Sequence, residues 1–279
     1  MNIIFLCNKK YYDHKMSRVR FHSVEAISRR NDSTLHMFGP GWEHWDDSLP
    51  AEQNIRSIYG RPDLVIGYKP LEINGFAQIS APKCIRYNEM YDVQWTIKEI
   101  MMSRSKYVIC HHENDYHKYV KMMSNYKNQG INLFHIAHCA EKTVFKDYDL
   151  PKKYDLFLGG ATNGVSILGK HYPLRDRMVG ILGKMSKKYK CHFHRHPGYN
   201  LGEASTNKYA IDFAQQISQA KIAVTCSGKP KSRFGKYIEI PMCGTALAAD
   251  LPDEDQDSFK KFMIEIDMSM TDEQIINKL

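Results

Sequence analysis

Short apolar runs recur along the first half of the chain, and polar or amphipathic stretches separate them. The runs predict strands at residues 2–7, 34–38, 63–67, 84–87, 107–110 and 132–136. Helical spacing predicts helices at residues 18–29, 92–102 and 116–123, and Asp92 is placed to act as the N-cap of the second. Alternation of this kind favours a parallel sheet with helices on both faces.

The alternation restarts after a polar segment at residues 147–153. Strands are predicted at residues 154–160, 190–194, 221–225 and 262–267, and helices at 174–188 and 210–219. Residues 233–243 predict a short helix ending at Gly244, and the small residues 245–249 a buried strand. Thr271 and Gln274 have the spacing of a capping box that begins a last helix. We therefore expect an α/β protein with two Rossmann-like domains, residues 1–150 and 151–279.

Composition fits this two-domain expectation. The chain has 279 residues, 43% of them hydrophobic and 25% charged, and single domains run to about 100–200 residues. No apolar run approaches the ~20 residues that span a bilayer, and residues 2–7 resemble a first core strand more than a signal peptide. Seven cysteines, an odd number, are typical of reduced thiols and predict a cytoplasmic protein.

The charge balance indicates an anionic partner. Lys and Arg exceed Asp and Glu by 39 − 31 = 8, an excess that suits nucleic acid, an acidic membrane or a phosphorylated small molecule. The cations are spread along the chain without a basic tract or a nucleic-acid motif. A phosphate-bearing ligand is the more economical interpretation. The alternative, that the excess of cations serves only solubility, stays open.

Residues 233–250 carry the most specific pattern in the chain. The short helix presents Tyr237, Ile238 and Met242 as apolar contacts with one carboxylate, Glu239, among them, and Gly244 follows. This segment resembles the glutamate–alanine/methionine–cysteine–glycine–threonine region of GT-B glycosyltransferases of the group 1 and exostosin-like type. The resemblance implies two Rossmann-like domains facing a cleft, and it implies that Glu239 holds the ribose of a nucleotide-sugar.

A second segment, residues 136–145, resembles the stretch with which these enzymes leave their first domain, so the likeness extends over most of the chain. Two departures matter. Many retaining relatives carry a glutamate eight positions before the ribose-binding one, and this chain has Lys231 there. The sequence also stops after a short helix, so we expect the usual crossover helix back to the first domain to be missing or abbreviated.

Donor-binding groups are expected where strands of the second domain end, because helix N-termini there offer N–H groups to phosphate. Gly160, in the run 159–164, would let backbone approach a ligand closely. Lys170 and Arg175 follow at the start of the next helix and could neutralise a diphosphate, although ordinary solvated positions explain them equally well.

A cationic loop, residues 225–236, precedes the Glu239 helix and includes Ser227. Four cations in eight residues are costly to cluster without an anion, and Arg233 and Lys236 are our first choices for the donor diphosphate. Asp250, at the end of the following strand, is expected to be a solvated loop residue.

Three histidines alternate at the end of another predicted strand. His192, His194 and His196 share one face by the strand period of two. A zinc site is one interpretation. Pro197 ends the strand and works against convergence of the three rings, so packing and cleft roles are favoured. Arg195 and His196, nearest the strand end, are the expected ligand contacts.

Candidate catalytic groups lie in the first domain. Glu89 follows one strand, and Asp13 and His14 follow another. An inverting transfer needs a base for the acceptor hydroxyl, and Glu89 is the first choice, although it could equally be a surface or hydrogen-bonding residue beside the helix. His111, His112 and Glu113 follow a third strand, but their spacing fits no zinc motif.

These observations predict a cytoplasmic hexosyl- or pentosyltransferase that moves a sugar from a nucleotide diphosphate donor to an acceptor hydroxyl, on a glycan. UDP is the expected nucleotide and GDP the alternative. No cofactor and no nucleic-acid partner is expected. No metal is expected either, because the two Asp-x-Asp spacings, at residues 147–149 and 253–255, fall in a linker and a late loop. Alternatives are a nucleotide-sugar epimerase of the same fold and a basic nucleic-acid-binding protein.

Overall fold

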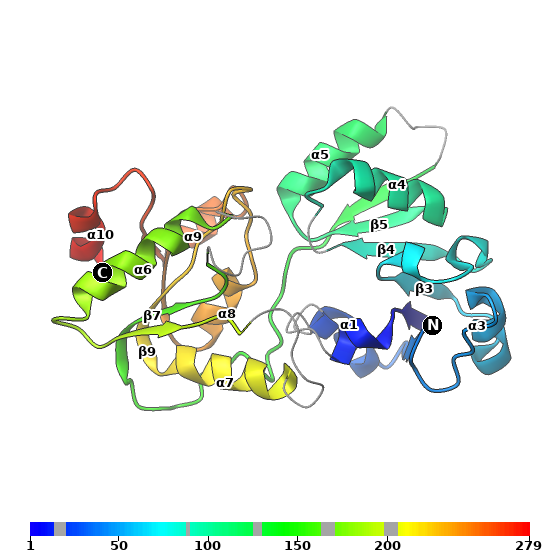
Figure 1. Ribbon diagram of the computed structural model, residues 1–279, viewed down its shortest axis with the longest axis horizontal. Coiled ribbons are helices and arrows are strands. Elements are labelled where there is room, and N and C mark those ends of the chain that lie inside the picture. Colours follow the sequence, from blue (N-terminus) through cyan, green and yellow to red (C-terminus); the bar gives the residue numbers. More distant parts are fainter. Residues whose placement is uncertain (14–20, 88–89, 125–129, 163–170, 198–205) are drawn as a thin grey trace. The chain divides into compact units, whose positions relative to one another are not determined.

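The chain forms two compact units, Met1–Ala137 and His138–Leu279, in the computed structural model (Figure 1). The structure describes residues 1–13, 21–87, 90–124, 130–162, 171–197 and 206–279. Each unit has its own parallel sheet with helices on both faces, and together they are the two Rossmann-like domains of the GT-B fold.

The N-terminal unit has a six-stranded sheet of order β2-β1-β3-β4-β5-β6, in which every described pairing is parallel. Its strands are β1 (Asn2–Leu6), β2 (Thr34–Phe38), β3 (Leu64–Gly67), β4 (Lys83–Tyr87), β5 (Tyr107–Cys110) and β6 (Asn132–His135). Its helices are α1 (Lys9–Asp13), α2 (His22–Glu25), α3 (Ala51–Tyr59), α4 (Val93–Ser103) and α5 (Glu113–Met123), with 3₁₀ turns at Ala26–Arg29, Pro70–Glu72 and Phe76–Gln78.

Strand β1 is apolar at every position after Asn2 because both of its faces are covered. Phe5 packs with α2 residue Val24, whereas Ile4 and Leu6 pack with Ile55 of α3 on the opposite face. Helices α4 and α5 cover one face of β4 and β5 (Figure 1). This two-sided burial explains the continuous apolar runs that predicted the strands.

The C-terminal unit has a five-stranded parallel sheet of order β11-β10-β9-β7-β8. Its strands are β7 (Tyr154–Gly159), β8 (Cys191–His194), β9 (Ala220–Val224), β10 (Ala246–Ala249) and β11 (Ile264–Glu265). Its helices are α6 (Pro173–Met185), α7 (Thr206–Ser218), α8 (Lys236–Met242), α9 (Gln256–Phe259) and α10 (Asp272–Lys278).

Strand β7 divides this sheet. It lies between β8 and β9, so the right-handed crossovers through α6 and α7 cover opposite faces. Leu156 and Leu158 pack against α6 and α10, whereas Phe157 contacts Phe213 of α7 with ring centroids 5.8 Å apart.

Both predicted helix starts are confirmed. The Asp92 carboxylate accepts a hydrogen bond from the backbone N–H of Trp95 at 2.9 Å. Thr271 and Gln274 form the reciprocal capping box of α10. Helix α3, which follows Pro50 and ends at Gly60, was not among the helices expected from the sequence. Its apolar residues Ala51, Ile55 and Tyr59 lie at helical spacing and pack on the core.

The division between the units falls at residue 137, ahead of the boundary expected at residue 150. Residues 147–152 belong to the C-terminal unit through specific bonds. Ser218 donates to Asp147 at 3.1 Å, and Lys152 Nζ donates to the carbonyls of Ser218 and Gly244 at 2.9 and 2.8 Å. These bonds explain why a stretch that reads as a polar linker is part of the second unit.

In the part of the chain that the structure describes, no helix is long and apolar enough to span a membrane. All seven cysteines are free thiols.

Candidate functional site

The carboxyl ends of β7 and β9 form the topological switch point of the C-terminal sheet. The chain leaves β7 toward β8 on one side and returns to β9 on the other, and parallel sheets bind ligands where such crossovers diverge. Gly160 follows β7, and Ser227 lies three residues after β9.

Gly160 lies beside two cationic side chains from different helices. Its φ of 110° is strained for other residues, and a Cβ built there would be 2.7 Å from Arg175 Nη1 and 2.9 Å from Lys236 Cε. The missing side chain therefore lets Arg175, on α6, and Lys236, on α8, converge next to the backbone that ends β7.

Arg175 is a buried cation that packs on a tyrosine ring. Its side chain belongs to a residue only 3% exposed, Nη1 donates to the Ala161 carbonyl at 2.9 Å, and the guanidinium lies 4.0 Å from the ring centroid of Tyr172. Its Nε is buried and has no hydrogen-bond partner among the residues that the structure describes. A solvated position and a phosphate ligand fit the sequence around Arg175 equally well, and tertiary packing is what buries this residue.

The amino end of α6 adds to this positive region. Helix α6 has 13 residues, begins with Pro173, and has no side-chain cap from its N-cap residue Tyr172. Uncapped N–H groups and the positive end of the helix dipole favour an anion. Together with the Arg175 guanidinium, they give the end of β7 a positive potential that favours an anion.

Glu239 lies on α8 as the sequence predicted, and it is buried. Its Oε2 is 3.6 Å from Lys236 Nζ, and its Oε1 would be 2.8 Å from a Cβ at Gly235. Burial lowers the pKa of Lys236, Glu239 opposes that shift, and Arg175 adds to it. Burial, and next the Glu239 charge, raises the pKa of Tyr209 to about 12.

The histidines of β8 are held by one glutamine. Gln216 Oε1 is 3.0 Å from His192 Nε2 and 2.9 Å from His194 Nδ1. His194 Nε2 is 3.2 Å from the hydroxyl of Tyr209. The packing role favoured from the sequence therefore fits these two residues, and among the described residues no group of three or more His, Cys, Asp or Glu side chains could hold a metal ion.

His196 continues beyond β8 toward the cations described above. Burial lowers the pKa of His196 to about 4, with further contributions from Lys236, Arg175 and His194. Arg195, its neighbour, is exposed. The structure thus brings Gly160, Lys236, Glu239 and His196 of the predicted donor-binding residues into one region.

Ser227 and Asp250 form a buried network, which corrects the expectation that Asp250 is solvated. The Asp250 carboxylate accepts hydrogen bonds from the Ser227 N–H and hydroxyl at 2.7 and 2.6 Å, from Lys231 Nζ at 3.1 Å and from the Tyr237 hydroxyl at 3.2 Å. Asp250 is 6% exposed. The network fixes the loop after β9 against α8.

Arg233 is surrounded by acidic groups. Its Nε lies 3.9 Å from Glu254 Oε2 and 3.4 Å from Asp255 Oδ2, and Nη2 donates to the His138 carbonyl at 3.2 Å. Glu254 is 2% exposed and also accepts from the Arg233 N–H. These ion pairs offset the charge of Arg233, which we expected from the sequence to bind the donor diphosphate.

The predicted catalytic residues are only partly described. Asp13 ends α1 and is 3.7 Å from Lys9 Nζ. His14 and Glu89, and the predicted donor ligand Lys170, lie outside the described residues. His111 and His112 are buried, and burial lowers the pKa of His111 to about 3.

A polar cluster at the switch point of the N-terminal sheet was not predicted. Lys69, two residues after β3, has a left-handed backbone with φ of 52°. Glu72 accepts from the Tyr11 hydroxyl at 2.6 Å and from Lys69 Nζ at 3.2 Å. Hydroxyl- and carboxylate-bearing side chains at this edge can hydrogen-bond a polar ligand.

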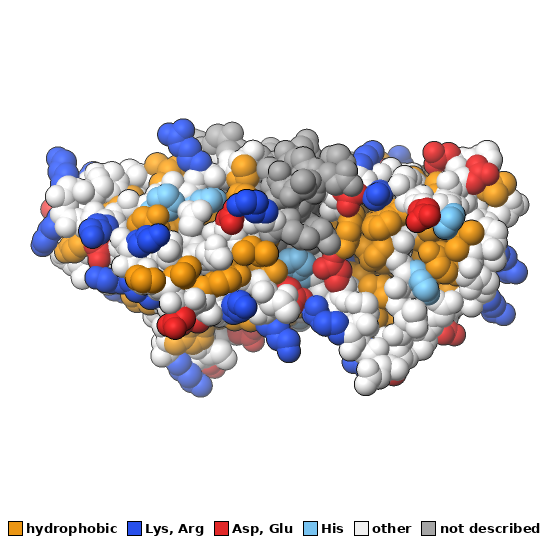
Figure 2. All heavy atoms as spheres, turned by 90° about the horizontal axis from the view of Figure 1, so that it is seen from below, with side chains coloured by type: hydrophobic (Ala, Val, Ile, Leu, Met, Phe, Trp, Pro, Cys, Tyr) orange, Lys and Arg blue, Asp and Glu red, His pale blue; other side chains and the backbone are white. Residues whose placement is uncertain are grey.

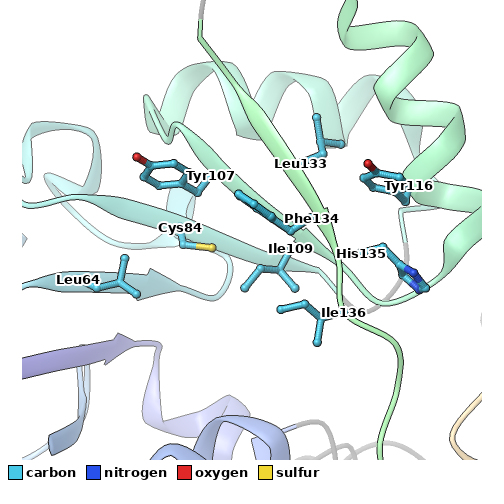
Figure 3. A pocket seen from close by; sticks show the side chains of 9 residues that line it. All are labelled: Leu64, Cys84, Tyr107, Ile109, Tyr116, Leu133, Phe134, His135 and Ile136. Atoms are coloured by element: carbon cyan, nitrogen blue, oxygen red, sulfur yellow. The ribbon is translucent and has the colours of Figure 1, made fainter. Parts of the chain in front are cut away.

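A separate apolar pocket of about 610 Å³ opens on the N-terminal unit (Figure 3). Its side chains come mainly from β3 to β6 and from α5: Leu64, Cys84, Tyr107, Ile109, Tyr116, Leu133, Phe134, His135 and Ile136. None of these lining residues, all in the part of the chain that the structure describes, is a carboxylate, Lys or Arg, so they offer neither a diphosphate nor a sugar hydroxyl a charged partner.

Known proteins resemble the chain in structure rather than in sequence. No family model matches it, and no curated protein does. A pneumococcal O-GlcNAc transferase, GtfA, in complex with UDP and GlcNAc is 16% identical over 77% of this chain, with a TM-score of 0.43. The chain spans about half of that protein's length, 48%.

An α-glucosyltransferase in complex with UDP and a 13-mer DNA containing an HMU base is 9% identical. The likeness covers 100% of this chain and 89% of that one, with a TM-score of 0.56. At this identity the likeness concerns the fold alone, and it shows that the chain has the two-domain GT-B architecture that its sequence predicted.

Proposed function

We propose that this protein is a glycosyltransferase that moves a hexosyl or pentosyl group from a UDP-sugar to an acceptor hydroxyl. The observation that carries the proposal is the buried carboxylate of Glu239 beside Lys236, in a region where Gly160 leaves room next to Arg175. A carboxylate can accept from both ribose hydroxyls, and the two cations match a diphosphate.

Two further observations favour a UDP-linked donor. The α8–β10 segment resembles the ribose-binding region of group 1 and exostosin-like enzymes, and the α-glucosyltransferase that shares the fold was solved with UDP. UDP is therefore the first nucleotide to test and GDP the second. The seven free thiols support a cytoplasmic location for the reaction.

The departing diphosphate is stabilised, in this proposal, without a metal. Arg175 and Lys236 converge beside Gly160, and the amino end of α6 has no side-chain cap. In the proposed complex these groups face the negative charge that grows as the sugar–oxygen bond breaks. Fixed donors aimed at developing charge stabilise the transition state more than the bound substrate. Arg233 contributes less in this arrangement, since Glu254 and Asp255 already pair with it.

We propose inversion at the anomeric carbon. A base in the N-terminal unit takes the acceptor's hydroxyl proton, the oxygen bonds to C1, and the C1–oxygen bond to the diphosphate breaks. Glu89 remains the first choice, with Asp13 and His14 next. Lys231 stands where retaining relatives have a glutamate, and it bonds Asp250 instead. NMR of donor and product anomers, with Glu89→Gln, tests this: a retained anomer contradicts inversion, and near-normal turnover removes Glu89.

The proposed acceptor is a glycan hydroxyl. On the face drawn in Figure 2, Lys and Arg side chains are scattered rather than gathered into a stripe along which a phosphate backbone could run. Because the α-glucosyltransferase was solved with DNA, an acceptor screen pairs glycans with hydroxymethyluracil-containing DNA. Transfer to the DNA alone would replace the glycan as acceptor and leave the donor assignment intact.

Isothermal titration of UDP into wild type and Glu239→Ala tests the donor site. We expect the dissociation constant to rise at least tenfold in the variant, because the ribose loses its acceptor. Glu273→Ala, which removes an exposed glutamate from α10, is the matched control and should bind like wild type. Equal affinity for UDP in a folded Glu239→Ala variant would remove Glu239 from the site.

A further inference from the structure

Gly235 immediately precedes α8 in a backbone conformation that does not require glycine. Its φ of −48° and ψ of −34° are right-handed helical values, which residues with a side chain adopt readily. Gly160 differs in this respect, because its φ of 110° is strained for other residues. What glycine provides at position 235 is therefore space beside the backbone rather than backbone freedom.

The space beside Gly235 holds the carboxylate of Glu239. A Cβ built at Gly235 would lie 2.8 Å from Oε1 and 3.5 Å from Cδ of Glu239. Apart from the chain neighbours and the helix backbone, no other heavy atom of the described residues comes within 4 Å of that Cβ. Gly180 and Gly183 of α6 have nothing within 4 Å. A side chain at position 235 would thus meet one group, the carboxylate of Glu239.

The carboxylate of Glu239 lies between Gly235 and a cation. Its Oε2 is 3.6 Å from Lys236 Nζ, and that Nζ lies 4.5 Å from the ring centroid of Phe213 on α7. Its Oε1 lies beside Gly235, and none of the described residues donates a hydrogen bond to Oε1. Glu239 is buried, whereas Gly235 is only half-buried. One carboxylate oxygen therefore faces Lys236, and the other lies next to backbone that a ligand can reach.

We propose that Gly235 is a positioning residue that makes the donor site select ribonucleotides over 2′-deoxyribonucleotides. Its missing side chain seats the Glu239 carboxylate where the two carboxylate oxygens accept from both ribose hydroxyls. The inference rests on the proposed function, since it needs Glu239 to hold the ribose. It adds the chemical class of the nucleotide, a ribonucleoside diphosphate, and the residue that determines this class.

The selectivity follows from the geometry of a two-point contact. Two neighbouring hydroxyls can both donate to one carboxylate only when its orientation is fixed. A hydrogen bond to a charged group is worth about tenfold to a hundredfold in affinity, and a site built to bind a hydroxyl rejects the analogue that lacks it. A methyl group at residue 235 displaces Oε1, because 2.8 Å is shorter than van der Waals contact. The carboxylate then loses the orientation that the ribose needs.

Isothermal titration with UDP and with 2′-deoxy-UDP tests the proposal. Wild type should bind UDP at least about tenfold more tightly than 2′-deoxy-UDP. Gly235→Ala should bind UDP about tenfold less tightly than wild type does, and its preference for UDP should fall below about threefold. Gly183→Ala is the matched control and should keep both wild-type values, since alanine there has open space. Full preference for UDP in Gly235→Ala would overturn the proposal.

A double-mutant cycle separates positioning from a general loss of structure. If Gly235 acts through Glu239, Gly235→Ala should change the dissociation constant of UDP by less than about twofold when Glu239 is already alanine. A tenfold loss in that background as well would refute the role of Gly235. Urea denaturation should find Gly235→Ala folded, because the displaced atom is the end of a flexible side chain. A variant that does not fold would also refute the proposal.

Inorganic pyrophosphate, which has no ribose, distinguishes the possible failures. It should bind Gly235→Ala no less tightly than wild type, and equal losses for pyrophosphate and UDP would overturn the positioning role. If Glu239→Ala weakens UDP binding and Gly235→Ala does not, the inference fails and the donor site stands. If Glu239→Ala binds UDP like wild type and wild type does not prefer UDP over 2′-deoxy-UDP, the ribose assignment of the proposed function fails, and this inference fails with it.

Discussion

Ser227 and Asp250 are locked together by two hydrogen bonds, 2.7 Å from the serine N–H and 2.6 Å from its hydroxyl to the two carboxylate oxygens. Ser227 follows β9 and Asp250 follows β10, so the pair joins two neighbouring strand ends. Lys231 and Tyr237 donate to the same carboxylate. The loop that enters α8 is thereby held before any ligand arrives.

We expect Asp250→Ala to lower the free energy of unfolding by about 2–4 kcal/mol, because it leaves the Ser227 N–H and hydroxyl buried without their acceptor. Urea denaturation measures this change. Asp257→Ala, which removes an exposed aspartate from α9, is the control and should change it by less than about 0.5 kcal/mol. Equal stability of the two variants would show that the Asp250 network contributes little.

Gly160→Ala should impair both stability and nucleotide binding. Its φ of 110° and the 2.7 Å approach to Arg175 Nη1 together predict a loss of about 1–3 kcal/mol, and the displaced guanidinium should weaken UDP binding. Gly180→Ala is the matched control: Gly180 lies within α6 with open space around it, and alanine there should add about 0.5–1 kcal/mol. Normal UDP affinity in Gly160→Ala would place the diphosphate elsewhere.

Arg175 and Arg233 make opposite predictions for binding and stability. Arg175→Met should raise the dissociation constant of UDP at least tenfold, because it removes the cation beside Gly160. Arg233→Met should change that constant by less than about threefold and lower the free energy of unfolding by about 3 kcal/mol, because Glu254 loses its buried partner. Titration of both variants with UDP measures the dissociation constants, and urea denaturation measures the free energies of unfolding. The reverse pattern would restore Arg233, the choice made from the sequence, as the diphosphate ligand.

Metal removal should leave transfer unaffected. Of the two Asp-x-Asp pairs, Asp147 accepts from Ser218 and the Asp149 N–H, and Asp255 lies 3.4 Å from Arg233 Nε. Both therefore have protein partners. Turnover is measured after EDTA treatment and again with added manganese. Activity lost with EDTA and recovered with manganese would contradict the metal-free proposal.

Local features of the sequence were sufficient for most of the fold. Apolar runs predicted the strands because parallel strands are buried on both faces, and Asp92 and Thr271 marked helix starts because a cap bonds groups only three residues away. Helix α3 was not predicted, although Ala51, Ile55 and Tyr59 recur at helical spacing. The start of the C-terminal unit ahead of residue 150 was not predicted from the sequence, because the hydrogen bonds of Lys152 reach residues 66 and 92 positions away.

In the candidate site, too, features that depend on neighbouring residues were predicted, and contacts between distant residues were not. The sequence by itself identified Glu239 on a short capped helix and Gly160 after a strand, since both depend on neighbouring residues. Only the tertiary structure buried Asp250 with Ser227, paired Arg233 with Glu254, and brought Arg175 and Lys236 together beside Gly160. Those relationships depend on the order β8-β7-β9-β10, which places distant strand ends side by side, and no short stretch of sequence specifies that order.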